Sequence, residues 1–128
     1  MEKFLNIKNV KYIEISTNIS ELIERVVYFT ESYNPSIISN GVGTFLLSKE
    51  AKKDNLKIVL TGDGADEVFC GYSICKENPK YMRKNILDDL EITELRKIDN
   101  ISMAHSIELR NPFLDRIIIA FANNLKRI

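Results

Sequence analysis

The sequence predicts an α/β fold in which a parallel sheet is followed by a helical C-terminal part. Two short runs, Lys11–Ile15 and Lys57–Leu60, have the alternating or β-branched character of strands. The stretch between them is long enough for two helices, and such a connection is typical of a parallel crossover. An acidic turn bounded by glycines follows Leu60 directly, where open α/β sheets bind their ligands. The 128 residues suit one domain, spanning residues 1–128.

Two helices are expected between the predicted strands. Asn18, with Glu21 three residues later, has the pattern of a capped helix start, and apolar residues repeat at helical spacing over Ile19–Thr30. Pro35 follows soon after and is expected to end this helix. Beyond two glycines, the run Thr44–Lys53 has one apolar side and one charged side, which predicts the second helix.

The C-terminal half is expected to be mostly helical. The polar stretch Lys76–Lys84 predicts a surface excursion, and Asp88–Ser106 predicts a helical region with a break at Ile98–Asn100. Pro112 interrupts the chain before a last helix, for which Asp115 is the expected cap. That helix is apolar on more than one face, so we expect it to be buried or to contact a partner.

The turn after Leu60 carries the chemistry that can be recognised from residue types. Gly62 and Gly64 allow a bound group to approach the main chain, and the helix start that follows offers N–H groups to an anion. Two like charges about 4 Å apart cost roughly 4 kcal/mol, whereas a helix start contributes about 1 kcal/mol at most. A phosphate could therefore share the turn with Asp63 and Asp66 only if a cation such as Mg²⁺ lay between them. The alternative, that Asp63 caps the helix and Asp66 neutralises its first turn, stays open.

Several other functions are excluded or disfavoured. Glu67 stands where the dinucleotide fingerprint needs glycine or alanine, Ala65 stands where a calcium loop needs an acid or amide, and no Gly-Lys-Ser/Thr phosphate loop occurs. The 18 basic and 18 acidic residues are scattered, so neither nucleic acid nor a membrane is an expected partner. No secretory pattern is present, which favours the cytoplasm. The single histidine, His105, is expected to be a packed side chain.

Two motifs resemble a known family. The run from Leu60 to Tyr72 is similar to the Leu-Ser-Gly-Glu-Gly-Ala-Asp-Glu-(Ile/Val/Leu)-Phe-Gly-Gly-Tyr signature of the asparagine synthetase family. The run from Asp99 to Asp115 resembles that family's Asp-Arg-x-Ser-Met-Ala-x-x-x-Glu-x-Arg-x-Pro-Phe-Leu-Asp. The resemblance covers most of the chain from Asn18 onward. It implies part of a parallel-sheet, adenine-nucleotide-binding domain of the ATP pyrophosphatase type, as in the synthetase domain of glutamine-hydrolysing asparagine synthetases.

The resemblance also implies a reaction and a set of residue roles. In the family, ATP and Mg²⁺ activate the side-chain carboxylate of aspartate as an adenylate, and ammonia from glutamine displaces AMP to give asparagine. Thr61 and Gly62 match the residues that contact the nucleotide. Asp63 matches the acid tied to forming the acyl-adenylate, and Asp66 the acid that holds magnesium and pyrophosphate. In the second motif, the matching residues are Asp99, Glu108 and Arg110. For these residues, a contact with substrate and a structural ion pair are both open.

This chain departs from the family pattern in several residues and in extent. Asp63 is shorter than the usual glutamate, Asn100 stands where arginine is common, and Cys70 stands where glycine is usual. The family's Ser-Gly-Gly-x-Asp-Ser pyrophosphate loop and its glutaminase domain are expected before Met1, and a lysine-bearing tail after Ile128. We therefore expect a piece of the synthetase domain that is inactive alone and that self-associates or binds a partner chain.

Three interpretations remain open at this point. The chain could be a fragment or split subunit of an asparagine synthetase-like ligase. It could instead be a non-catalytic remnant that binds a partner chain. A third possibility is a relative that forms an amide on another carboxylate, which the shorter Asp63 keeps in consideration.

Overall fold

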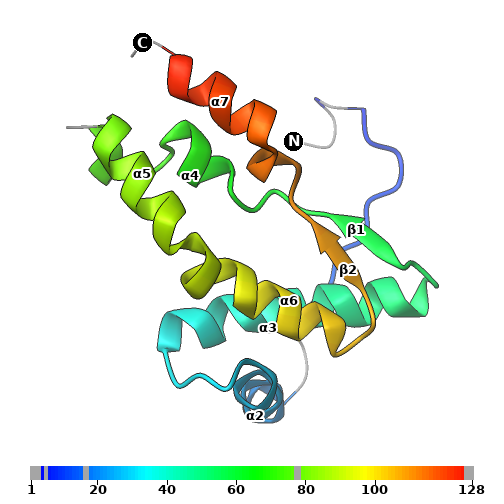
Figure 1. The fold of residues 1–128 in the computed structure, drawn as a ribbon. Coiled ribbons are helices and arrows are strands. Elements are labelled where there is room, and N and C mark those ends of the chain that lie inside the picture. The colour runs from blue at the N-terminus through cyan, green and yellow to red at the C-terminus, as the bar shows by residue number, and fades with distance from the viewer. Residues whose placement is uncertain (1–3, 5, 16–17, 77–78, 126–128) are drawn as a thin grey trace.

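The computed structural model describes residues 4, 6–15, 18–76 and 79–125 of the chain. It shows an α/β arrangement in which a parallel pair of strands lies beside a group of packed helices (Figure 1). The described elements are α2 (Ile19–Thr30), α3 (Pro35–Lys53), β1 (Ile58–Leu60), α4 (Ala65–Phe69), η1 (Ser73–Lys76), α5 (Pro79–Leu90), η2 (Glu91–Leu95), α6 (Arg96–Met103), β2 (Glu108–Arg110), η3 (Pro112–Leu114) and α7 (Arg116–Asn124). None of the helices in these ranges has the length and apolar character needed to cross a bilayer.

The core forms where α2, α3 and α6 pack against one another. The apolar stripe predicted for α2 supplies two residues of this core, and the other core residues come from α3 and α6. Burying a side chain of this size contributes about 1.5–3 kcal/mol. The core residues are Leu22, Val26, Val42, Phe45 and Ile101.

Helix α3 begins much earlier than the sequence predicts. Pro35 is its first residue, and the side chain of Asn34 caps it by accepting a hydrogen bond from the Ser36 N–H at 2.9 Å. The prediction of a helix confined to Thr44–Lys53 is therefore wrong, because the glycines that favoured a loop lie inside the helix. Gly41 has a packing role there: a Cβ on it would lie 2.7 Å from Val26 Cγ1 and 2.9 Å from Ile101 Cδ1.

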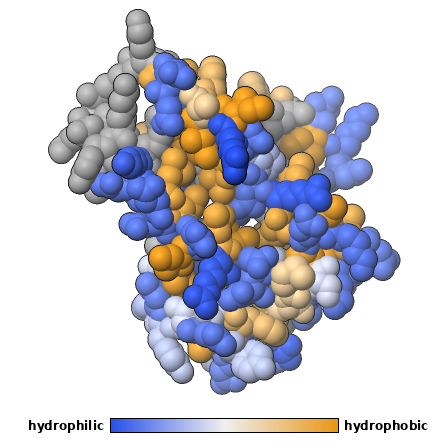
Figure 2. Space-filling view, in the orientation of Figure 1, coloured by the Kyte–Doolittle hydropathy of each residue, from blue (hydrophilic) through white to orange (hydrophobic). Residues whose placement is uncertain are grey.

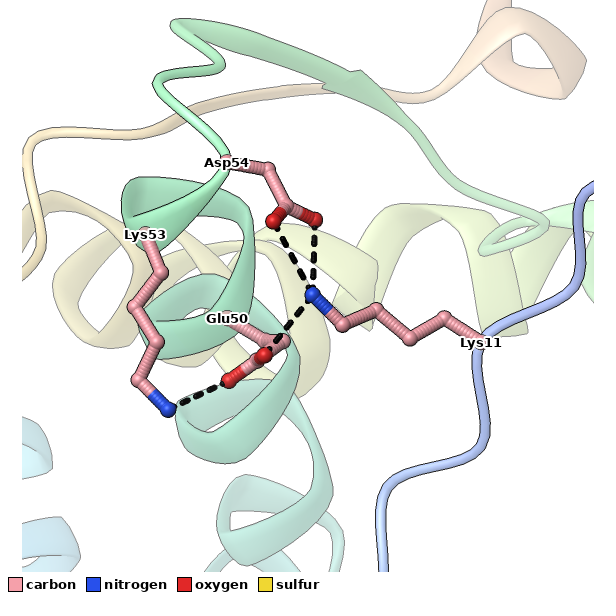
Figure 3. Close-up of polar contacts among 4 residues, drawn as sticks. All are labelled: Lys11, Glu50, Lys53 and Asp54. Carbon is pink, nitrogen blue, oxygen red and sulfur yellow. Dashed lines mark hydrogen bonds and ion pairs between the residues drawn. The ribbon is translucent and has the colours of Figure 1, made fainter.

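The predicted strand at Lys11–Ile15 is not formed. This segment has no regular secondary structure and pairs with no strand in the part of the chain that the structure describes. It is held instead by its side chains: Lys11 Nζ lies 2.7 Å from Glu50 Oε1 and 2.9 Å from Asp54 Oδ2, at the end of α3 (Figure 3). The alternation that suggested a strand is present, but a strand needs a hydrogen-bonding neighbour.

The parallel sheet predicted from the sequence exists, but with a different second strand. β1 matches the predicted strand Lys57–Leu60 and pairs in parallel with β2, with Val59 opposite Leu109. The predicted partner, Lys11–Ile15, was the wrong one. β2 lies within the second motif, where no strand is predicted because three residues are too few to show a period.

Helical structure runs without interruption from α5 through η2 to α6. The break expected at Ile98–Asn100 is absent; the irregularity lies earlier, in the π-helical turn η2. The stretch Lys76–Lys84, expected to be a surface excursion, includes the start of α5, and its residues 77 and 78 lie outside the described residues. Ile98 and Ile101 are both buried, so the packing of α6 against α3 keeps this region helical.

The last helix, α7, begins as the sequence predicts. The Asp115 side chain accepts a hydrogen bond from the Ile117 N–H at 2.8 Å, which confirms it as the cap. Only Ala122 is buried in this helix, whereas Ile117 and Phe121 are 79% and 60% exposed. Apolar residues are visible through the middle of the face seen in Figure 2, bordered by hydrophilic ones. The sequence predicts that α7 is either buried or in contact with a partner. Within the described chain, α7 is not buried.

Candidate functional site

The acidic turn connects β1 to the short helix α4, as the strand, turn and helix pattern predicts. Gly64 is the N-cap of α4 with φ +88°, a backbone angle that favours glycine. A side chain at this position would also overlap that of Leu114 in η3. A glycine is therefore required at position 64, both by the backbone angle and by the close approach of the second motif.

Hydrogen bonds join the turn to the second motif. The N–H of Thr61 donates to the Arg110 carbonyl oxygen at 2.9 Å, extending the ladder between β1 and β2 by one residue. The Thr61 hydroxyl donates to Asn111 Oδ1 at 3.3 Å and accepts from the Asp63 N–H at 3.4 Å. The two sequence motifs, about fifty residues apart, thus meet at the carboxyl end of the sheet.

Asp63 and Asp66 line the same pocket of about 210 Å³. Both carboxylates are exposed to solvent, and α4 places them on one side of the turn, as their spacing suggests. Helix α4 has only five residues, so its dipole offers less to an anion than the sequence argument assumed. The residues around this acidic pocket are Asn40, Gly62, Asp63, Gly64, Asp66, Glu67, Tyr72, Leu90, Glu94 and Leu95.

Glu67 belongs to this pocket too, although the sequence analysis gave it no role. Its side chain is buried, with 7% of the residue exposed, and it accepts a hydrogen bond from the Tyr72 hydroxyl at 2.5 Å. That bond to a carboxylate, together with burial, raises the pKa of the Tyr72 phenol well above its usual value. A helical rotation of about 100° separates Glu67 from Asp66, but the pocket is wide enough to contact both.

An ion pair between a buried lysine and a partly exposed glutamate borders the pocket. Lys97 is 4% exposed and its ammonium pairs with Glu94, which comes from η2 and lines the pocket. An unpaired ammonium would be costly at this depth, so Glu94 has a structural task. The sequence does contain a signal for this ion pair, because Glu94 and Lys97 carry opposite charges and lie three residues apart in a predicted helical region.

The acidic pocket suits a hard cation only with help from a ligand. Among the described residues, no three His, Cys, Asp or Glu side chains come together as a metal-binding group. Magnesium is usually held by one or two carboxylates together with substrate phosphates and water. Asp63 and Asp66 provide such a pair of exposed carboxylates, so the donor set fits Mg²⁺ bound jointly with a phosphorylated ligand.

A larger pocket, of about 510 Å³, opens on the other side of the turn. Thr61, Gly62 and Asp63 contribute to its lining, together with apolar side chains from α3, β1 and β2 and charged ones from the end of α3. A Cβ on Gly62 would meet no atom within 4 Å, so the main chain there is open to a bound group. No local sequence pattern predicts this pocket, because the segments that line it are far apart in the chain.

The remaining predicted site residues lie elsewhere. Asp99 is exposed on α6 and lines a third pocket of about 270 Å³ with Asn111 and Leu114. Glu108 and Arg110 form an exposed ion pair with each other, at 2.7 Å between Arg110 Nε and Glu108 Oε1. Neither of these two lines the acidic pocket or the larger pocket beside it. His105 is packed as expected, with its ring edge-on to Phe45 at 4.5 Å.

Comparison with known proteins agrees with the two motifs. The sequence model of the family described as asparagine synthase matches residues 1–92 and 80–127. Glutamine-hydrolysing asparagine synthetases of Lotus japonicus and Arabidopsis thaliana are each 34% identical to this chain, over 107 and 110 residues. The enzyme of Saccharomyces cerevisiae is 29% identical over 110 residues.

These matches cover 80% to 82% of this chain but only 18% to 19% of the three relatives. The chain therefore spans about a fifth of the length of the curated relatives it matches. The family match extends over nearly the whole chain, through both motifs and the strands and helices that bring them together. This chain belongs to the asparagine synthase family.

Proposed function

We propose that this chain forms part of the active site of an asparagine synthetase-like, ATP-dependent amide-forming ligase, working as a fragment or split subunit. The observation that carries the proposal is the meeting of Asp63 and Asp66 on one pocket at the carboxyl end of a parallel strand. Ligands bind in this place in open α/β sheets. The adenine-nucleotide-binding character of the domain is part of the proposal and is supported by family membership.

In this proposal, the nucleotide lies against Thr61 and Gly62. The open space around Gly62 leaves its main chain free to approach a phosphate or ribose closely. The Thr61 hydroxyl already bonds to Asn111 and to the Asp63 N–H, which fixes the turn in one conformation. A fixed turn binds a ligand without first losing its own conformational freedom.

Asp63 and Asp66 are assigned to the reacting phosphates. Bound ATP would supply the activating group for the carboxylate, and Mg²⁺ would neutralise the phosphates beside the two acids. Asp66 would hold the metal and pyrophosphate, and Asp63 would take part where the acyl-adenylate forms. Repulsion of about 4 kcal/mol per close pair of like charges exceeds the roughly 1 kcal/mol available from a helix start. Nucleotide binding here is therefore expected to require the metal.

The acceptor is proposed to be a small carboxylate such as aspartate, with ammonia derived from glutamine as the nucleophile. Asp63 is one methylene shorter than the family's glutamate, so an amide-forming reaction on a different carboxylate is the variant to test. Because Glu108 and Arg110 neutralise each other, a structural role suits them better than a substrate contact. Asp99, which is exposed beside its own pocket, remains a candidate for contact with substrate.

The experiment combines the purified chain with a second chain that carries the Ser-Gly-Gly-x-Asp-Ser loop. Magnesium-dependent ATP binding is measured by calorimetry, and carboxylate activation by exchange of labelled pyrophosphate into ATP with aspartate or other amino acids. We expect Asp66→Asn to weaken binding of the metal and nucleotide more than Glu67→Gln, and the chain alone to show no exchange. Equal losses in the two variants would contradict the role given to Asp66.

A second candidate function is that of a non-catalytic chain that binds a partner. The exposed apolar residues of α7 and the edge of β1 that pairs with no other described segment favour it. Stable association with the loop-bearing chain, combined with no exchange for any carboxylate, would support this alternative. Exchange dependent on one amino acid would exclude it and would identify the substrate.

A further inference from the structure

The Thr61 hydroxyl lies between two hydrogen-bond partners just after β1. It donates to Asn111 Oδ1 at 3.3 Å and accepts from the Asp63 N–H at 3.4 Å. A hydroxyl carries one proton and two lone pairs, so one lone pair remains beyond these two bonds. Thr61 also lines the larger pocket of about 510 Å³. Toward a ligand in that pocket, the Thr61 hydroxyl therefore acts as an acceptor and not as a donor.

Asn111 contacts Thr61 from outside the larger pocket. It lines the third pocket, together with Leu114, and belongs neither to the lining of the larger pocket nor to that of the acidic pocket. The hydrogen bond between the two side chains is partly buried. An influence of Asn111 on a ligand in the larger pocket therefore passes through Thr61.

The main chain holds Asn111 level with Thr61. The carbonyl oxygen of the preceding residue, Arg110, accepts the Thr61 N–H at 2.9 Å, as part of the pairing between the two strands. The Asn111 carbonyl oxygen accepts the Leu114 N–H at 3.0 Å, which closes the turn η3. Pro112 follows and keeps Asn111 out of the helical region, here at φ −111° and ψ 83°. The side chain of Asn111 thus starts from a fixed backbone.

The direction of the Thr61 proton decides which part of a nucleotide can lie against it. An ionised phosphate oxygen offers lone pairs and no proton, so it makes no hydrogen bond with a hydroxyl that also presents a lone pair. A ribose hydroxyl or the amino group of adenine carries a proton and makes this bond. Gly62 leaves room for such a group, because a Cβ there would meet no atom within 4 Å.

We infer that Asn111 is a positioning residue for nucleotide binding. By accepting the Thr61 proton, it makes the Thr61 hydroxyl an acceptor for a proton-bearing group of the nucleoside and disfavours a phosphate at that position. The inference rests on the proposed function for the nucleotide itself. The orientation of Thr61 by Asn111 rests on the hydrogen bonds alone.

The first experiment needs no ligand. Exchange of the Thr61 hydroxyl proton with water is measured in the full chain by NMR, from the hydrogen–deuterium isotope shift of its Cβ. We expect slow exchange in the natural sequence and in Asn111→Asp, which keeps an acceptor oxygen, and about tenfold faster exchange in Asn111→Leu, which has none. Asn124→Leu makes the same change at an exposed residue of α7 and should have no effect. Equal exchange in the natural sequence and Asn111→Leu would overturn the inference.

The second experiment measures ligand binding by calorimetry on the purified chain combined with the loop-bearing chain. Adenosine carries hydroxyl and amino protons but no phosphate, whereas Mg²⁺-pyrophosphate offers acceptor oxygens. We expect Asn111→Leu to weaken adenosine binding about tenfold, the usual cost of one lost hydrogen bond, and to leave pyrophosphate binding unchanged. Asn111→Asp should bind adenosine as the natural sequence does. A merely structural role for Asn111 would weaken the binding of both ligands and would overturn the inference.

A double-mutant cycle tests whether Asn111 acts through Thr61. Thr61→Val removes the hydroxyl and keeps the shape of the side chain. We expect Thr61→Val to lose as much adenosine affinity as Asn111→Leu, and the double variant to lose no more than either variant alone. Additive losses would contradict the inference, because Asn111 would then act on the ligand by another route.

Two analogues identify the group that donates to Thr61. The ribose hydroxyls are missing from 2′,3′-dideoxyadenosine, and the amino group is missing from purine riboside. The analogue without the donor should bind equally to the natural sequence and to Asn111→Leu. A difference that persists with both analogues would overturn the inference. Absence of adenosine binding to the natural pair of chains would count against the proposed function, and the proton exchange alone then decides whether Asn111 orients Thr61.

Discussion

The carboxylate of Asp66 lies directly against the α-carbon of Gly71. Helix α4 ends at Cys70, which has a left-handed backbone angle of φ +58°, and the Gly71 N–H donates to the Asp66 carbonyl oxygen at 2.9 Å. The chain therefore folds back over the first turn of its own helix. A side chain at position 71 would overlap Asp66 Oδ1, so a glycine here keeps the carboxylate in its place.

Gly71→Ala should move the Asp66 carboxylate away from the acidic pocket. We expect at least a tenfold loss of magnesium-dependent nucleotide affinity in the reconstituted pair, which corresponds to about 1.4 kcal/mol. Calorimetry measures the affinity. Gly43→Ala is the matched control, because a Cβ there meets no atom within 4 Å and the residue lies outside the pocket. Unchanged affinity in Gly71→Ala would show that the position of Asp66 is unimportant for binding.

The two glycines of α3 should respond in opposite directions to the same substitution. Gly41→Ala puts a methyl group 2.7 Å from Val26 Cγ1 and 2.9 Å from Ile101 Cδ1, and such overpacking costs about 1–3 kcal/mol. Gly43→Ala has free space, so it should stabilise the helix by up to about 1 kcal/mol. Urea unfolding followed by circular dichroism gives both changes. A stabilised Gly41→Ala would mean that α2 and α6 can move apart without loss.

The same glycines show why the sequence predicts only part of this fold. Glycine lowers helix propensity, so two of them within three residues predict a loop, yet the crossing of α3 with α2 and α6 requires the absence of a side chain at Gly41. That requirement depends on contacts between distant segments. The helices at Ile19–Thr30 and after Asp115, by contrast, are marked by local periodicity, and both are confirmed. The end signal is confirmed for Asp115, whereas the Asn18 side chain, expected to cap α2, makes no capping hydrogen bond.

The candidate site, too, can be predicted only in part from the sequence. Asp63 and Asp66 could be singled out because a strand, a glycine turn and a helix start follow one another in the sequence. Glu67 carries no such signal in the sequence, and only the fold reveals that it lies on the same pocket and bonds to Tyr72. Glu94 approaches from η2, a segment whose contact with the turn no local pattern encodes.

His105 should make the protein less stable in mildly acidic solution. Burial lowers the pKa of its imidazole, a hydrogen bond with the Ile101 backbone acts in the opposite direction, and the positive charges of Lys52, Lys49 and Arg25 add to the lowering. Because the unfolded chain binds the proton more readily, stability is full above the ordinary pKa of 6.5 and falls as the pH drops below it.

The measurement is the urea midpoint between pH 7.5 and pH 5.5, which should decrease for the natural sequence. His105→Gln removes the titrating group, so its midpoint should change much less over this range. An identical decrease in both proteins would assign the effect to other groups.

The N-terminal segment should detach from α3 in acid. The pKa of Glu50 is lowered to about 2 because its carboxylate accepts hydrogen bonds from Lys11 and then from Lys53. A carboxylate with a lowered pKa in the folded state stabilises the fold above its ordinary pKa of 4.5, and this contribution is lost as the pH falls toward 2.

NMR should show the amide signals of Tyr12 and Ile13 moving toward random-coil positions between pH 4.5 and pH 2. Lys11→Met should produce the same shift at pH 7, whereas Lys8→Met, which leaves the contacts to Glu50 intact, should not. Signals from Tyr12 and Ile13 that stay fixed from pH 6 to pH 2 would mean that apolar contacts of Ile13, which lines the larger pocket, hold the segment without the ion pairs.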